Sequence, residues 1–159
     1  MLSVILRFVY VLSLALWIGS IVFFSFLAAP SIFRVLPREA AGTVVAAILP
    51  KYYWEGIICG VLCLATSLVL GVRNRWSVLL IVRVVLLGLM LVAVLYAVVS
   101  LQPKIQAVKA QISTVAGLSP TDPLHVEFGR LHQRSVGINS AVLLLGIAVV
   151  FITAFTMKI

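Results

Sequence analysis

Four long apolar runs constrain this chain more than any other feature of its sequence. They cover about residues 3–29, 51–72, 77–101 and 135–157, and each has the roughly 20 residues that a helix needs to cross a bilayer. Because lipid offers no hydrogen bonds to the backbone, a spanning run must satisfy its own N–H and C=O groups as a helix. We therefore predict an all-α integral membrane protein, a four-helix bundle in one four-span transmembrane domain over residues 1–159.

The composition is typical of the same class. Hydrophobic residues make up 64% of the chain, charged residues 10%, and the mean hydropathy is +1.26, whereas a soluble domain carries about 25% charged residues. The net charge of +8 comes from Lys and Arg scattered between the apolar runs, which is the pattern of membrane flanks and not of a nucleic-acid surface. We expect contact with membrane lipids, no nucleic-acid partner, and the bacterial plasma (inner) membrane as the location.

Three segments between the runs continue the helical pattern beyond the bilayer. Residues 38–50, 104–117 and 123–134 are predicted as interfacial or protruding helices, all on one side of the membrane. The second of them alternates apolar and polar residues at helical spacing, so we expect it to pack against the third as a hairpin. Pro30 is expected to end the first helix, and at Pro50 the second helix is expected either to kink or to continue and protrude.

Charge on the two sides of the membrane predicts the orientation. An even number of spans places both termini on one side. The first and third connections hold seven Lys and Arg residues, and the termini with the second connection hold four. Since positive residues favour the cytoplasmic side, we expect the extended side to be cytoplasmic and the termini to be non-cytoplasmic.

A polar stripe on the last helix marks the candidate site. His125, Phe128, His132, Ser135 and Asn139 follow one another at steps of three and four residues, which places them on one helix face. The stripe runs from a polar segment into an apolar one. Polar groups at membrane depth are costly, so this face should look toward other helices or a wet cavity. We expect function near His132, Ser135 and Asn139.

Other polar residues within the apolar runs allow more than one interpretation. Glu55 needs a basic partner, a proton or water, and Lys51 four residues earlier is its simplest partner. Arg83, about two turns inside the third run, can either snorkel back toward the Arg73 turn or pair inside the bundle, and snorkelling is favoured. Cys59 and Cys63 lie one turn apart and read either as two packing residues or as a soft-metal or redox pair, whereas a disulfide between them is disfavoured. A stripe of small residues permits close helix approach and a homo-oligomer: Gly56, Gly60, Cys63 and Ser67.

Two separated motifs resemble the transmembrane-protein-205-like family over nearly the whole chain. They are Phe33-Arg34-Val35-Leu36-Pro37-Arg38 followed by Gly42, Pro50 and Tyr52, and Phe128-Gly129-Arg130-Leu131-His132 followed by Ser135 and Asn139. The resemblance implies a four-span fold. Animal members are associated with tolerance of platinum drugs, which implies export or trafficking of metal-bearing compounds, and the family is distantly similar to copper- and haem-handling four-helix membrane proteins.

The family motifs also nominate site residues. We expect six of them to converge into one polar cluster on the extended side, or alternatively to cap helices and bond them together: Arg34, Arg38, Tyr52, His132, Ser135 and Asn139.

Three functions are consistent with these residues. The first is a transporter or exporter that moves or binds a small ion, a metal or a metal-bearing compound, with Glu55 added to the six motif residues as the binding set. The second is a haem- or metal-binding, oxidoreductase-like membrane protein, with His132, Cys59 and Cys63 as candidate metal ligands. The third is a non-catalytic scaffold that binds a partner through Ile105, Val108 and Ile112. A soluble-type enzyme is disfavoured and no catalytic residue is nominated, because the sequence holds no nucleophile–base–acid set, phosphate loop or zinc motif.

Overall fold

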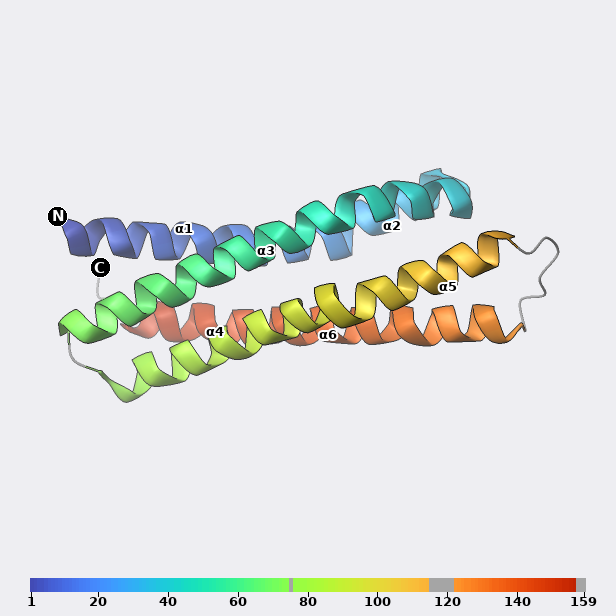
Figure 1. Cartoon of the computed structure of the whole chain (residues 1–159). Helices are drawn as coiled ribbons and strands as arrows, with labels where there is room; N and C mark the ends of the chain where they lie inside the picture. Colours follow the sequence, from blue (N-terminus) through green and yellow to red (C-terminus); the bar gives the residue numbers. More distant parts are fainter. Residues whose placement is uncertain (75, 115–121, 157–159) are drawn as a thin grey trace.

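Four long helices run up and down the length of the molecule in the computed structural model, which describes residues 1–74, 76–114 and 122–156 (Figure 1). All four are long and apolar enough to cross a membrane. This confirms the predicted all-α bundle with four candidate spans. The elements in chain order are α1 (Leu2–Val22), the π-helical segment η1 (Phe23–Ala28), α2 (Ala29–Val35), α3 (Arg38–Asn74), α4 (Val78–Tyr96), the π-helical segment η2 (Ala97–Leu101), α5 (Gln102–Thr114) and α6 (Pro123–Thr156).

The helices form an antiparallel bundle in which chain neighbours are also neighbours in space. α1 packs on α3, α3 on α4, α4 on α6, and α6 on α1. The start of α1 and the end of α6 lie at the same end (Figure 1), as an even number of spans requires. The interdigitating core is apolar and has Trp17 near its middle; its other fully buried large side chains include Tyr10, Ile21, Leu87, Met90, Val142 and Val149.

Small residues let the helices approach closely around the Trp17 ring. A methyl group added at Gly60 would lie 2.9 Å from that ring, and one at Gly56 would lie 3.0 Å from its Nε1. The predicted small-residue stripe on α3 is thus buried inside this bundle. Homo-oligomerisation through the same stripe stays a prediction.

The expectation that Pro30 ends the first helix is wrong. The chain continues as a helix from Leu2 to Val35, and a π-helical segment precedes the proline. In this segment the Ala29 N–H bonds to the Phe24 carbonyl five residues back, and such a wide turn accommodates a ring that would clash in a regular α-helix. The helix ends at Leu36 instead, which is extended, as the residue before a proline usually is.

Pro50 lies inside α3, which is helical from Arg38 to Asn74. The helix continues through this proline, and a kink there stays a prediction. The helix has 37 residues and is about 55 Å long at 1.5 Å per residue, well beyond the roughly 30 Å hydrocarbon core. The second helix is therefore longer than one crossing needs, and its protrusion from the bilayer stays a prediction.

The expectation that Arg83 snorkels is also wrong. Its side chain is only 5% exposed, and the guanidinium carbon lies 4.8 Å from the centre of the Tyr10 ring. The reason is its place on the helix: it shares the inward face of α4 with Leu80, Leu87, Met90 and Val94.

The extended end carries the predicted hairpin. α5 packs along the first part of α6, which confirms that expectation, although the predicted helix end at residue 117 lies outside the described residues. The Lys109 ammonium also donates a 3.1 Å hydrogen bond to the Gly42 carbonyl of α3. The apolar face nominated for a scaffold function is half-buried: Ile105, Val108 and Ile112.

Candidate functional site

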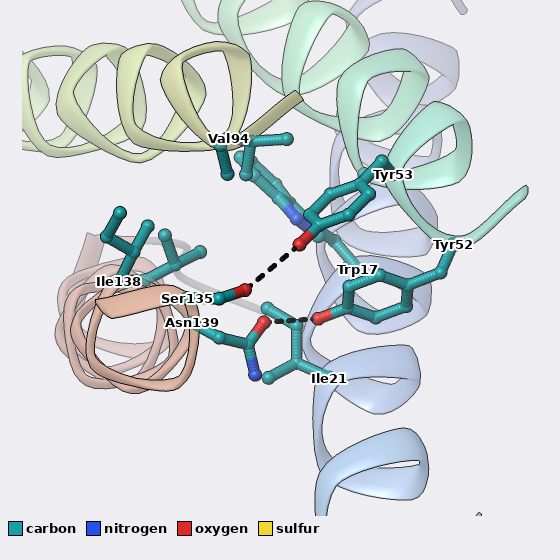
Figure 2. Close-up of a pocket in the computed structure, with 11 residues that line it drawn as sticks. Trp17, Ile21, Tyr52, Tyr53, Val94, Ser135, Ile138 and Asn139 are labelled. Atoms are coloured by element: carbon teal, nitrogen blue, oxygen red, sulfur yellow. Dashed lines mark hydrogen bonds between the residues drawn. The ribbon is translucent and has the colours of Figure 1, made fainter. Parts of the chain in front are cut away.

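Three polar side chains from three different helical segments meet inside the bundle. The Tyr52 hydroxyl of α3 donates to the Asn139 side-chain carbonyl of α6 (Figure 2). The Asn139 amide nitrogen donates to the Ser25 hydroxyl of η1 at 2.9 Å. All three side chains are partly buried. Phe24 stacks on the Tyr52 ring with 5.1 Å between ring centroids, which fixes the orientation of the phenol.

A second set of contacts lies beside the first. The Tyr53 and Ser135 hydroxyls are 3.5 Å apart (Figure 2), and the Gln102 amide donates to the Tyr53 hydroxyl at 3.0 Å. Tyr52 and Tyr53 are themselves in edge contact. Together these residues form what we call the polar cluster: Ser25, Tyr52, Tyr53, Gln102, Ser135 and Asn139.

The polar cluster borders a small cavity. Its volume of about 10 Å³ is close to what one water molecule needs. Asn139 and Ser135 line it on the α6 side, the two tyrosines on the α3 side, and the rest of the lining is mainly apolar: Trp17, Ile21, Gly56, Val94, Ala97, Ile138 and Val142. A larger hollow of about 160 Å³ lies between α3 on one side and η2 with α5 on the other, and Tyr53 lines both spaces.

Glu55 lies one turn deeper than Tyr52 on α3, and its partners are uncharged. Ser20 donates to its carboxylate at 2.8 Å, and the Cys59 thiol donates at 3.4 Å. Lys51 is exposed and no ion pair joins it to Glu55, so the expected Lys51 partner is wrong. The only ion pair within the described part of the chain joins Arg130 and Glu127. The carboxylate at the edge of the apolar region is therefore stabilised by two neutral donors.

The structure brings together three of the six motif residues that were expected to converge. Tyr52, Ser135 and Asn139 meet in the polar cluster, whereas Arg34, Arg38 and His132 are exposed at the extended end. The His132 ring instead stacks on Phe128 of its own helix, with 6.2 Å between centroids. A binding role for these three basic residues stays a prediction.

Four residues of the site were not nominated from the sequence. In the sequence, Tyr53 is typical of an interfacial aromatic belt, and Ser25 lies within a run of bulky residues. Gln102 falls at the end of the third apolar run, and Ser20 has no charged residue near it in the sequence. The useful signal was present only for Tyr53, which directly follows a motif residue. For the other three, only the register between helices shows that they face the site.

The nominated metal ligands each have a separate partner in the structure. Both thiols are free and buried; Cys59 bonds to Glu55, and Cys63 donates to the Tyr10 carbonyl at 3.7 Å. His132 is exposed. Within the described residues, no group of three or more His, Cys, Asp or Glu side chains could hold a metal ion. A metal site at His132, Cys59 and Cys63 stays a prediction.

The four candidate spans and the partly buried polar cluster define a four-span integral membrane protein whose polar groups meet inside its bundle. The chain belongs to the family described as a domain of unknown function (DUF4149), which matches residues 12–114. It is similar to an uncharacterized protein of Aquifex aeolicus (strain VF5), with 36% identity over 144 residues that cover 91% of this chain and 92% of the relative. No solved structure matches this chain.

Proposed function

We propose that this protein is a transporter- or exporter-like membrane protein that binds a small cation, or a compound carrying one, at the polar cluster. The observation that carries the proposal is the contact between Tyr52 and Asn139, which joins two helices beside a small cavity. Polar residues inside membrane bundles commonly mark the route of an ion or solute. The resemblance to the transmembrane-protein-205-like family supports cargo movement.

The charges of the site favour a cation over an anion. The polar cluster offers hydroxyl and amide oxygens, and the Glu55 carboxylate lies one turn deeper with no cation paired to it in the described part of the chain. The Arg34, Arg38 and His132 side chains are exposed outside the cluster. Oxygen donors with one carboxylate form a suitable environment for a positive charge.

Movement of a solute requires the bundle to change shape. The cavity beside Asn139 has room for about one water molecule, so a larger cargo needs Tyr52 and Asn139 to separate. This contact then acts as the closed position of a route between the extended end and the bundle interior.

The other two functions have less support. The scaffold hypothesis requires an exposed apolar face on α5, and that face is half-buried. Metal or haem binding has no group of three ligating side chains within the described residues.

Flux into sealed vesicles tests the proposal. The full chain is reconstituted into liposomes, and entry of rubidium ion and of the tetraammineplatinum(II) dication is followed by elemental mass spectrometry. We expect Glu55→Gln and Asn139→Leu to lower the flux about tenfold, equivalent to about 1.4 kcal/mol. Thr43→Ala is the matched control, because Thr43 is exposed on α3 and bonds only to Glu39 of its own helix. Flux no higher than in empty liposomes, or equal flux in wild type and both variants, would reject the proposal.

A further inference from the structure

A second group of buried polar residues lies at the opposite end of the bundle, toward the chain termini. Tyr10 of α1 and Thr153 of α6 are hydrogen-bonded at 2.8 Å, and Thr153 in turn donates to the Val149 carbonyl. The Arg83 guanidinium lies over the Tyr10 ring. Exposure is 0% for Tyr10, 5% for Arg83 and 7% for Thr153. Arg83 is thus a desolvated positive charge inside a membrane bundle.

Two atoms in this region lack any hydrogen-bond partner. They are Nε of Arg83 and Oγ of Ser67, and among the described residues no other buried side-chain nitrogen or oxygen is unpartnered. Ser67 is 0% exposed. Native proteins rarely leave buried polar groups unsatisfied, so each such group needs an explanation.

The two unpartnered atoms lie at the same level of the bundle. Gly71 of α3 faces Leu80 of α4, and Gly60 faces Leu91, so residues of α3 and α4 whose numbers sum to 151 are opposite each other. Ser67 is therefore opposite residue 84, next to Arg83. Both residues are buried. The register therefore places the two unpartnered donors at one level along the bundle axis.

No acidic side chain neutralises Arg83. The chain has four Asp and Glu residues, and none lies within 4 Å of the guanidinium. By the same register Arg83 is opposite residue 68 of α3. Glu55 lies 13 residues from that position along the helix, about 20 Å at 1.5 Å per residue. Glu39, Asp122 and Glu127 lie still farther, in the extended half. The Tyr10 ring is the one compensating neighbour that the structure gives.

We propose that Arg83 and Ser67 form a binding site for a phosphate-type oxyanion, independent of the polar cluster and of its cation. A guanidinium is a planar donor that matches the oxygens of phosphate, and a serine hydroxyl adds a further donor. Thr153 fixes Tyr10, and Tyr10 holds the guanidinium. The site lies about 9 Å along the axis from the start of α4, since six residues separate Ser77 from Arg83. At that end of the bundle, two sources carry this oxyanion chemistry: free phosphate and a lipid head group.

Thermal unfolding of the full chain tests this site. The protein is purified in a neutral detergent, stripped of lipid, and unfolded with either inorganic phosphate or phosphatidylglycerol added, against chloride at the same ionic strength. We expect the bound anion to raise the unfolding midpoint of the wild type by about 2 to 4 °C. Arg83→Gln should abolish the shift. Arg73→Gln should retain it, because Arg73 is an exposed arginine at the same end of the bundle.

The two ligands separate the two sources. A shift with inorganic phosphate supports a site for the free anion, and a shift with phosphatidylglycerol alone supports a head-group site. The proposal is overturned if neither ligand stabilises the wild type, or if Arg83→Gln shows the wild-type shift.

Two milder variants keep the test decisive if Arg83→Gln does not fold. Ser67→Ala removes an unpartnered hydroxyl, so the midpoint without anion should stay the same or rise, while anion affinity falls about tenfold. Arg83→Lys keeps the charge but loses the planar donor, and a similar loss is expected. Wild-type affinity in both variants would contradict the assignment.

Discussion

The Tyr52 hydroxyl donates a hydrogen bond to the side-chain carbonyl of Asn139, which lies 87 positions further along the chain. The same amide group donates to Ser25, so one side chain of α6 ties together two other helical segments. This arrangement lies beside the cavity, and it links the stability of the bundle to the site proposed for the cargo.

Replacing Asn139 by Leu should destabilise the fold. The substitution removes two interhelical hydrogen bonds and leaves the partly buried Tyr52 hydroxyl without its acceptor, for an expected loss of about 1–2 kcal/mol in the free energy of unfolding. Equilibrium unfolding in mixed detergent micelles measures it. Ser140→Leu, at the exposed neighbouring position, should change stability by less than about 0.5 kcal/mol. Equal effects of the two substitutions would contradict the role given to Asn139.

Two glycines of α6 should respond in opposite ways to the same substitution. A methyl group at Gly146 would overlap the Ile18 side chain, whereas one at Gly137 would meet nothing within 4 Å. Gly146→Ala should lower the free energy of unfolding by about 1–3 kcal/mol through overpacking. Gly137→Ala should raise it by about 0.5–1 kcal/mol, because alanine favours a helix over glycine. Thermal unfolding of both variants checks the pair, and a Gly146→Ala protein as stable as the wild type would contradict the expected overpacking against Ile18.

The two native cysteines should be unreactive in the folded protein. Cys59 is 5% exposed and Cys63 is 0% exposed, so a membrane-impermeant maleimide should label neither thiol until the protein is unfolded in SDS. Mass spectrometry counts the adducts. Cys added in place of the exposed Ser77 provides the positive control. Rapid labelling of Cys63 in the native state would mean that the α1–α3 contact opens readily.

Reporter fusions should place the chain termini outside the cytoplasm. The extended side carries seven Lys and Arg residues in its connections against four on the other side, and this bias directs the extended side to the cytoplasm. Alkaline phosphatase fused after residue 159 should then be active, and a green fluorescent protein at the same position should be dark. A bright fluorescent fusion would reverse the orientation, but it would leave the fold unchanged.

The class of fold could be predicted from the sequence because it depends on the chain's own hydrophobicity. Runs such as 77–101 are long enough to span a bilayer, and the lipid environment allows them only one regular backbone structure. The end of the first helix could not be predicted in this way. A π-helical turn before Pro30 lets the helix continue, and no local propensity signals that turn.

The candidate site was only partly predictable for a related reason. The spacing of Ser135 and Asn139 identifies a polar face on one helix, but it does not show what that face meets. The register between helices places Ser25, Tyr53 and Gln102 in the polar cluster. The same register leaves three other residues exposed: Arg34, Arg38 and His132.

The sequence by itself determined that this protein is a bundle of four membrane-length helices, because burial of apolar side chains in lipid and backbone hydrogen bonding act on each run separately. Only the tertiary structure decided which polar groups meet: Tyr52 with Asn139 at one end, and Arg83 over Tyr10 at the other. These contacts depend on the rotation and axial offset of one helix against its neighbour, which are set by side chains packing across the interface, such as Trp17 on Gly60.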